Sequence, residues 1–239
     1  MSRPPVATRA QQIELRMAAR TLSRSGLAHA YGHCSLRLDA GHFLVCAAKP
    51  MGLIAPGEDG VVVAIDAELP AGVLGEVRIH QQIYRRRAEV GAVIRSMPAQ
   101  VMTLSCARLT PQSRHGMGAY FHSSIPLWDD PQLLRDDLQA AALAEQLAGN
   151  PALVMRGNGA IVVGGSLVEA LTLNWYLEDA ARIELQLLAA GLAGPVLSAG
   201  ETERRATNSG RIFERMWDYL TAGDAEAAVY LQDGLQEGN

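Results

Sequence analysis

The sequence has few cysteines, no long apolar run and no excess of positive charge, and each absence narrows what the protein can be. The longest hydrophobic stretches are broken by glycine, proline or charged residues before reaching the ~18–20 residues that a membrane-spanning helix requires. A net charge of −4 and an isoelectric point of about 5.9 provide no general attraction to nucleic acid or anionic lipid. We therefore expect a small-molecule ligand, with no nucleic acid and no membrane partner.

The three cysteines, Cys34, Cys46 and Cys106, are an odd number and show no C-x-x-C spacing. This pattern is typical of a reducing compartment rather than of a disulfide-linked domain. The amino-terminal segment is polar, without an apolar core or a small-residue cleavage site, which predicts no signal peptide. We expect a cytoplasmic protein with three buried thiols.

At 239 residues, of which 49% are hydrophobic, the chain is long enough to bury the core of one domain. No internal repeat, low-complexity tract or linker divides it, so we predict a single domain over residues 1–239. Strand-like and helix-like segments intermix without the regular spacing of repeated βαβ units. This order predicts an α/β domain with a mixed, largely antiparallel sheet flanked by helices.

Hydrophobic periodicity and turn residues predict the positions of the helices and strands. Capping residues support three of the helix ends: Asp130 and Gly149 at the two ends of one helix, and Ser166 with Glu169 as a capping box at the start of another. The predicted helices are 7–24, 75–87, 98–106, 130–149, 166–190 and 201–222. The predicted strands are 34–39, 42–48, 60–66 and 90–97, with two more around a glycine turn in 152–165.

Four segments resemble the class II aldolase/adducin family, particularly its aromatic-acid decarboxylase-like branch. They are LSRSGLAHAYGHCSLRL (22–38), GEVRIHQQIYRRRAEVGAVIRSMPAQ (75–100), HGMGAYF (115–121) and ALVMRGNGAIVVGGSLVEAL (152–171). The similarity extends over about residues 10–190. It implies a small anionic substrate and a homo-oligomer, with a tetramer favoured, because active sites of the family usually lie between neighbouring subunits.

The resemblance also assigns the catalytic glutamate of the family to Glu76. Three histidines that bind a divalent ion in typical members correspond here to Arg95, Met97 and Asn158. A neutral imidazole offers a lone pair to a metal, whereas a guanidinium has none and repels a cation. We therefore expect no metal ion and no other cofactor.

Arg95 then has two interpretations, which the sequence leaves open. It could stabilise a carboxylate or a developing oxyanion in place of the metal. Alternatively, it only fills the vacated space with an ion pair to Glu76. The other polar residues to which the resemblance gives a role at the substrate are His33, His80, Arg114, His115 and Asn158.

Glu76, His80 and His115 also have structural alternatives. Glu76 could be a surface residue near a helix start, His80 a hydrogen-bonded core histidine, and His115 an exposed loop histidine. A rival site would gather His33, Glu76, His80 and His115 around a metal ion, although nothing in their spacing requires it.

Together, the residues and the resemblance predict a metal-independent carbon–carbon lyase acting on a small hydroxylated or aromatic carboxylic acid. Decarboxylation is the first expected reaction and retro-aldol cleavage the second. Glu76 would transfer the proton, Arg95 would hold the oxyanion, and His33 would orient polar groups. The alternative is a non-catalytic member that binds a small molecule or supports assembly, as adducin does, because a fold does not determine a function.

Overall fold

Seven strands form one mixed sheet in the computed structural model, which describes residues 4–122 and 124–236. Their order is β3-β2-β1-β4-β7-β6-β5, and neighbouring strands are antiparallel except for β5 and β6, which are parallel. This confirms the predicted mixed, largely antiparallel sheet, although β5 was not predicted. The strands are β1 (His33–Arg37), β2 (His42–Val45), β3 (Val61–Ala64), β4 (Ala92–Ser96), β5 (Leu127–Trp128), β6 (Ala152–Met155) and β7 (Ala160–Gly164).

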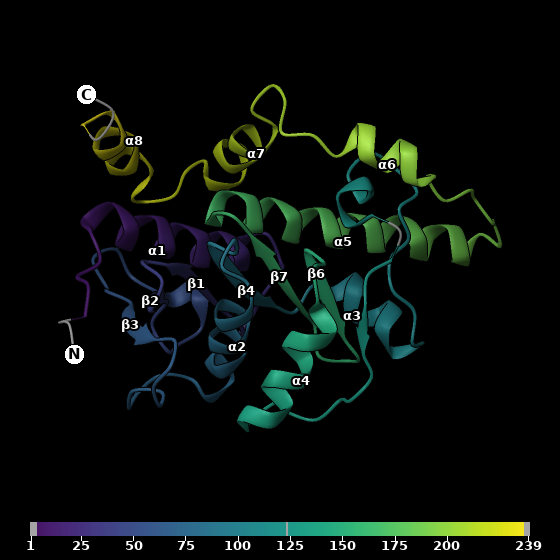
Figure 1. Ribbon diagram of the computed structural model, residues 1–239. Helices are drawn as coiled ribbons and strands as arrows, with labels where there is room; N and C mark the ends of the chain where they lie inside the picture. Colours follow the sequence, from purple (N-terminus) through teal and green to yellow (C-terminus); the bar gives the residue numbers. More distant parts are fainter. Residues whose placement is uncertain (1–3, 123, 237–239) are drawn as a thin grey trace.

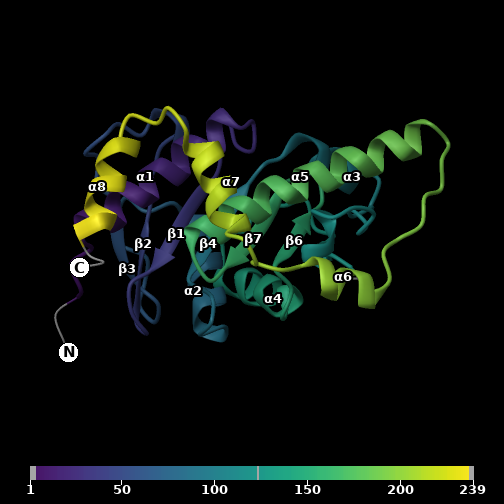
Figure 2. The same cartoon turned by 90° about the horizontal axis from the view of Figure 1, so that it is seen from above.

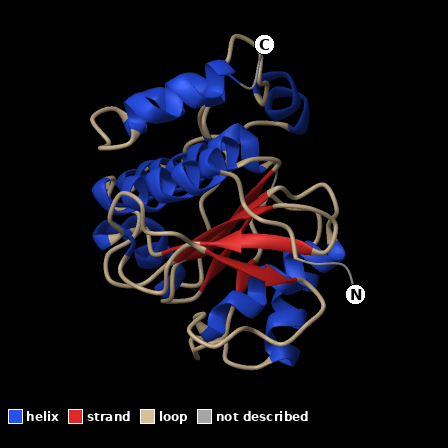
Figure 3. Ribbon diagram, turned by 90° about the vertical axis from the view of Figure 1, so that its left-hand side faces the viewer, coloured by secondary structure: helices blue, strands red, loops and turns tan. Residues whose placement is uncertain are grey.

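Helices connect the strands and cover both faces of the sheet (Figures 1 and 3). The α-helices are α1 (Arg9–Arg24), α2 (Arg78–Arg86), α3 (Ala99–Cys106), α4 (Asp137–Leu147), α5 (Leu167–Ala189), α6 (Ala199–Arg205), α7 (Ile212–Thr221) and α8 (Ala227–Gln236). Three short 3-10 turns, η1 (Met51–Leu53), η2 (Gly75–Val77) and η3 (Gly118–Phe121), lie between them. The helices α1, α2, α3 and α5 lie where the periodicity predicted them.

The hydrophobic core lies on both faces of the sheet. On one face, α1, α3 and α5 pack against alternate strand residues, among them Cys34 and Ile94. On the other face, α2 and α4 pack against Val93 and Ile161. Because successive strand side chains point to opposite faces, Arg95 shares the face of Val93 and points toward the side covered by α2 and α4.

Helix α4 differs from its prediction at both ends. Its N-cap is Asp136, whereas the predicted cap, Asp130, closes a turn in the preceding segment. The buried side chain of Leu134 holds that segment outside the helix. At the other end, the C-cap is Ala148 rather than Gly149, and Ala148 has a positive φ of 48°. Both predicted caps were therefore wrong, because several residues here are competent to cap a helix.

Helix α5 begins after Ser166 and ends just before Gly191, close to the prediction. The predicted capping box is only half formed: Ser166 accepts the backbone N–H of Glu169, but the Glu169 carboxylate accepts the N–H of Gly165. Although α5 has 23 residues, it carries several charged side chains. No helix within the described parts of the chain is long and apolar enough to cross a membrane.

The carboxy-terminal region differs from the single helix predicted over residues 201–222. It forms α6 and α7, separated by an irregular segment that ends at Arg211 in a left-handed conformation, and a further helix, α8, that was not predicted. Seen from above, α7 and α8 lie over α1 and the start of α5, while α6 lies toward the far end of α5 (Figure 2).

The cysteines are free thiols, and two of them match the expectation. Cys34 on β1 and Cys46, directly after β2, are both buried, and the backbone N–H of Cys34 lies 3.4 Å from the Cys46 sulfur. Cys106, at the end of α3, is exposed. The expectation of three buried thiols was wrong for Cys106, because it lies on the open side of a short helix.

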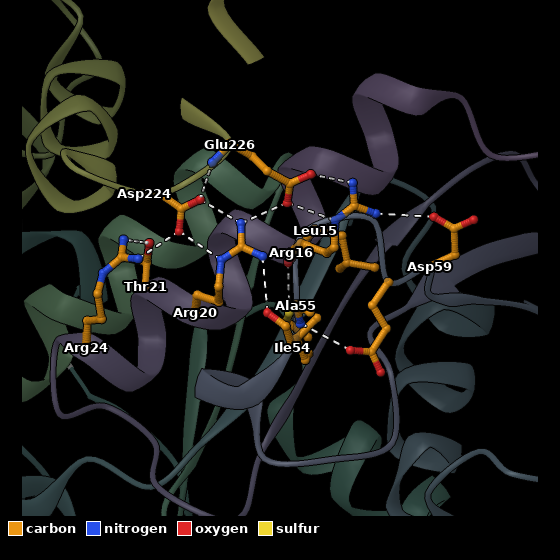
Figure 4. Close-up of polar contacts among 12 residues, drawn as sticks. Leu15, Arg16, Arg20, Thr21, Arg24, Ile54, Ala55, Asp59, Asp224 and Glu226 are labelled. Atoms are coloured by element: carbon orange, nitrogen blue, oxygen red, sulfur yellow. Dashed lines mark hydrogen bonds and ion pairs between the residues drawn. The ribbon is translucent and has the colours of Figure 1, made fainter. Parts of the chain in front are cut away.

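Buried ion pairs attach the segment between α7 and α8 to one face of α1 (Figure 4). Arg16, Arg20 and Arg24 are spaced by one helical turn and therefore lie on the same side of α1. Arg20 pairs with Asp224 at 2.6 Å, Arg16 with Glu226 at 2.7 Å, and Arg24 with Asp224 at 2.7 Å. These pairs fix the carboxy-terminal helices to the amino-terminal helix.

We predict that Asp224→Asn lowers the free energy of unfolding by about 3 kcal/mol at pH 7, because buried guanidinium groups lose a charged partner. Although burial alone would raise it, the hydrogen bonds from Arg20 and Arg24 lower the pKa of Asp224 from 3.8 to about 2. The advantage of the wild type is therefore complete above pH 4 and decreases as the pH falls toward 2. Urea unfolding across this pH range measures it.

The matched control is Asp66→Asn, which breaks a more exposed pair with Arg85. We expect this variant to lose less than about 1 kcal/mol. Equal losses in the two variants would contradict a stabilising role for the buried network.

Candidate active site

Four polar side chains meet at one edge of the sheet, on the face covered by α2 and α4. His33 begins β1, Arg95 lies near the end of β4, Asn158 lies in the turn between β6 and β7, and Glu76 lies in η2. Strands β1 and β4 run antiparallel with His33 directly opposite Arg95. The pairing of β4 with β7 brings the Asn158 turn to the same edge. The sheet therefore joins segments that are far apart in the sequence.

Two glycines allow the backbone to approach closely at this edge. Gly159 has a φ of 86°, and a Cβ there would lie 2.0 Å from the carbonyl oxygen of Ser96. Only glycine fits this contact, which holds the neighbouring Asn158 beside the end of β4. Gly32, which directly precedes His33, has a φ of 144°, and a Cβ there would lie 3.0 Å from the carbonyl oxygen of Arg95 in β4.

Arg95 is the central residue of the cluster. Its Nε lies 3.3 Å from Oε2 of Glu76, and its Nη2 donates a 2.8 Å hydrogen bond to Oδ1 of Asn158. Its Nη1 donates to the carbonyl oxygen of Ser96 at 3.2 Å. The side chain is only 2% exposed. The structure thus brings Arg95 together with Asn158 and Glu76.

The Arg95–Glu76 pair is charged at neutral pH. Burial alone would raise the pKa of Glu76, but nearby His33 and the positive charge of Arg95 lower it below its usual value. Burial lowers the pKa of Arg95, and the Glu76 carboxylate opposes this shift. Since an arginine ordinarily loses its proton only above about pH 12, Arg95 remains a cation.

A second polar group extends from His33 into the core. His33 Nδ1 lies 2.8 Å from Nε2 of His80, whose Nδ1 lies 2.6 Å from Oγ of Ser35. Ser35 Oγ is in turn 2.9 Å from the hydroxyl of Tyr84. Burial lowers the pKa of both histidines, so both are neutral at pH 7. His80 is thus a buried, hydrogen-bonded histidine that also supports a residue of the site.

Several buried polar atoms of the site have no hydrogen-bond partner within the described residues. They are His33 Nε2, Glu76 Oε1, Arg95 Nε and Asn158 Nδ2. His33 Nε2 is 3.9 Å from the Glu76 carboxylate, which is too long for a hydrogen bond. Buried polar groups normally find partners, and their convergence here indicates a place for a polar ligand. The side chain of Glu76 is 20% exposed and is the part of the ion pair that solvent can reach.

This group of residues does not fit a divalent metal ion. Arg95 has no lone pair and brings a positive charge, and the amide oxygen of Asn158 already accepts from Arg95. His33 Nδ1 and His80 Nε2 are hydrogen-bonded to each other, so neither nitrogen is directed at a metal position. In residues 4–122 and 124–236, no three histidine, cysteine, aspartate or glutamate side chains are grouped so that they could hold a metal ion.

Two predicted substrate contacts, His115 and Arg114, lie elsewhere in the chain. His115 Nε2 is 3.0 Å from Asp179 Oδ2, and Arg114 Nε donates to Glu184 Oε2 at 2.5 Å. Both acidic residues belong to α5, which covers the opposite face of the sheet. The structure therefore does not bring these residues to the Arg95 cluster of the same chain, and the rival four-residue metal site is not formed.

The sequence model of the family described as Class II Aldolase and Adducin N-terminal domain matches residues 13–185 of this chain. The chain belongs to this family. It is 28% identical over 204 residues to a 3,4-dihydroxyphthalate decarboxylase of Terrabacter sp. (strain DBF63), covering 76% of this chain and 83% of that protein. A 3,4-dihydroxyphthalate decarboxylase of Arthrobacter keyseri is 26% identical over 197 residues, covering 73% and 77%. The expected similarity to the decarboxylase-like branch is thus confirmed.

The solved structures agree with this family membership. The crystal structure of L-fuculose-1-phosphate aldolase from Thermus thermophilus superposes with a TM-score of 0.69 at 27% identity. The superposition covers 80% of this chain and 100% of the aldolase chain. The fold that carries the Arg95 cluster is therefore also the fold of an aldolase.

No role at the site was assigned to Ser35, Tyr84 or Arg135 from the sequence. Ser35 and Tyr84 carried a detectable signal, since Ser35 is two residues after His33 on a strand and Tyr84 is one helical turn after His80. Arg135 carried none, because it lies in the irregular segment before α4. Its positive charge nevertheless reaches Glu76 and helps to lower the pKa of that carboxylate.

We predict that Arg95→Met raises the pKa of Glu76 above its ordinary value of 4.5, because burial then outweighs the remaining favourable contacts. A pH titration of the Glu76 carboxyl ¹³C resonance, assigned with Glu76→Gln, measures the shift. Arg85→Met, which removes an arginine paired with Asp66, is the control and leaves the titration of Glu76 unchanged. An unshifted Glu76 in Arg95→Met would contradict the ion pair.

Proposed function

We propose that this family member is a metal-independent carbon–carbon lyase that decarboxylates a small hydroxylated aromatic acid. The observation that carries the proposal is the buried Arg95–Glu76 pair, with 3.3 Å between Nε and Oε2. A fixed guanidinium supplies positive charge where a catalytic metal ion would otherwise supply it. The two similar decarboxylases support an aromatic acid as the substrate class. Retro-aldol cleavage is the second reaction that the same groups would support.

The position of the substrate follows from where its charge moves. As carbon dioxide leaves, the negative charge of the carboxylate passes through the ring to an ortho or para oxygen. A cation beside the departing carboxylate would stabilise the starting state, whereas a cation beside the ring oxygen stabilises the transition state. We therefore place the ring oxygen near Arg95 and Asn158. The carboxylate then lies away from Arg95, toward the accessible side of the site.

Glu76 would carry the proton in this reaction. As a carboxylate, it accepts the proton of the ring hydroxyl and delivers it to the ring carbon that bears the carboxylate. The bond from that carbon to the carboxylate then breaks, and its electron pair restores the aromatic ring. Carbon dioxide and a phenolate are formed, and solvent later protonates the phenolate. The substrate hydroxyl thus accepts the electrons without a metal.

The other polar groups would orient the substrate. His33 and Asn158 each direct an unpartnered nitrogen to the site. We propose that His115 and Arg114 contact substrate only across a subunit boundary, in a homo-oligomer for which a tetramer is favoured. The protein would act in the cytoplasm, where its free thiols remain reduced.

One observation favours the alternative of a non-catalytic, ligand-binding or assembly protein. Arg95 is 2% exposed and already contacts Glu76, Asn158 and the backbone of Ser96. An arginine held by these three contacts could hold the ends of the strands together without any reaction. The two functions differ in what removal of Arg95 does to turnover.

We predict that the wild type converts 3,4-dihydroxyphthalate to a dihydroxybenzoate and carbon dioxide, measured by product chromatography. Arg95→Met lowers kcat/KM by about 10²-fold with the fold retained, because the transition state loses a buried positive charge. Arg95→Lys does not restore the rate, because a point charge lacks the planar fork of donors. Arg156→Met, in the same turn as Asn158 but paired with Asp129, is the control and retains full activity.

Undiminished turnover or carboxylate binding in Arg95→Met, together with a lower melting temperature, would end the oxyanion role. Arg95 would then be a structural residue. Absence of turnover in the wild type with a panel of hydroxylated benzoates and phthalates would favour the non-catalytic alternative.

A further inference from the structure

The hydrogen bonds from Tyr84 to His33 form a chain with two different ends. The inner end is the Tyr84 hydroxyl, which lies in the core, and the outer end is His33 Nε2, which faces the carboxylate of Glu76. His33, Ser35, His80 and Tyr84 are each no more than 2% exposed. Water therefore has little access to these hydrogen bonds. The neighbouring groups then determine which atom of each pair carries the proton.

Two arrangements of the protons run the three internal contacts in a single direction. A third, in which Ser35 accepts from both Tyr84 and Nδ1–H of His80, leaves the buried Ser35 proton without an acceptor among the described residues and is therefore costly. In the outward arrangement, Tyr84 donates to Ser35, Ser35 donates to Nδ1 of His80, and Nε2–H of His80 donates to Nδ1 of His33. The proton of His33 is then on Nε2. In the inward arrangement every donor and acceptor is exchanged, and the proton of His33 is on Nδ1.

Both ends of the chain favour the outward arrangement. In the inward arrangement the Tyr84 proton has no acceptor among the described residues, and a buried hydroxyl without an acceptor is costly. At the other end, the inward arrangement would turn the lone pair of His33 Nε2 toward the ionised Glu76, 3.9 Å away. The outward arrangement satisfies the Tyr84 proton and directs an N–H toward a negative charge.

We propose that Ser35 and His80 are positioning residues that hold neutral His33 with its proton on Nε2, so that His33 presents an N–H donor to an anionic oxygen of the ligand. Arg95 Nε and Asn158 Nδ2, which are also donors without a hydrogen-bond partner in the described chain, are the other donors of this group. Three donors beside one carboxylate select a ligand that offers a negatively charged oxygen and a hydroxyl proton. This ligand class rests on the proposed function, whereas the position of the His33 proton does not.

The proton position can be measured in the protein without substrate. Long-range ¹H–¹⁵N correlation spectra of histidine-labelled protein at pH 7.5 distinguish protonated from unprotonated ring nitrogens, and His33→Gln assigns the resonances. We expect one neutral tautomer of His33, with Nε2 protonated and Nδ1 unprotonated. A proton on Nδ1 in the wild type would overturn the proposal.

Two variants test the direction of the chain. Ser35→Ala removes the group that donates to His80, so the two ¹⁵N shifts of His33 move toward each other as a mixture of tautomers forms. Tyr84→Phe leaves the Ser35 proton directed at His80, and the shifts of His33 are retained. In the inward arrangement Tyr84→Phe would instead remove the acceptor of Ser35 and change them. Unchanged shifts in Ser35→Ala, or changed shifts in Tyr84→Phe, would contradict the proposal.

Matched controls remove similar hydroxyls on the opposite face of the sheet. Ser113→Ala deletes a buried serine that donates to backbone carbonyls, and Tyr120→Phe deletes a buried tyrosine that donates to the carbonyl of Thr207. Neither alters His33. With 3,4-dihydroxybenzoate as the probe, an equal mixture of tautomers in Ser35→Ala weakens binding about twofold relative to Ser113→Ala, because only the molecules with the proton on Nε2 keep that donor to the anion. If the tautomer is as proposed but the probe does not bind, the proposed function fails and the positioning role stands.

Discussion

The buried ion pair between Arg95 and Glu76 governs the chemistry of the sheet edge on which the rest of the site is built. A guanidinium with 2% exposure needs a negative partner and hydrogen-bond acceptors, and Glu76, Asn158 and the backbone of Ser96 provide them. Because His33 and Arg95 lower the pKa of Glu76, the pair supplies a fixed cation and a carboxylate that stays ionised at neutral pH. Both properties depend on the register of β4 against β1 and β7.

A second buried charge network, between α1 and the segment before α8, has a different character. Arg16 and Arg20 are paired with Glu226 and Asp224 in contacts of 2.6 to 2.9 Å, so their strongest donors are already used. The Arg95 cluster instead leaves several polar atoms without partners. A satisfied network stabilises the attachment of two helices, whereas an unsatisfied one indicates a place for a ligand.

The sequence allowed much of the fold to be predicted, because periodicity is a local property. The apolar spacing of α1 and the glycine turn between β6 and β7 were both read correctly. Local signals failed where neighbouring residues compete for one role, as Asp130 and Asp136 do for the start of α4, or where packing decides the end of a helix, as between α6 and α7.

The site was predictable only in part for the same physical reason. Glu76 and Arg95 were identified through the family resemblance, and the structure brings them together. The contact of His33 with His80 joins β1 to α2 across 47 positions and depends on sheet register, which no local pattern encodes. His115 and Arg114 matched a family segment, yet their acidic partners on α5 hold them on the other face of the sheet.

In the proposed mechanism, Arg95 and Glu76 act where a divalent ion would otherwise be needed. The metal content of protein purified without chelator, measured by inductively coupled plasma mass spectrometry, decides whether this is so. We expect less than about one-tenth of an equivalent of zinc, manganese or iron, because the guanidinium of Arg95 would repel a cation at this site. About one equivalent of any of these metals would contradict it.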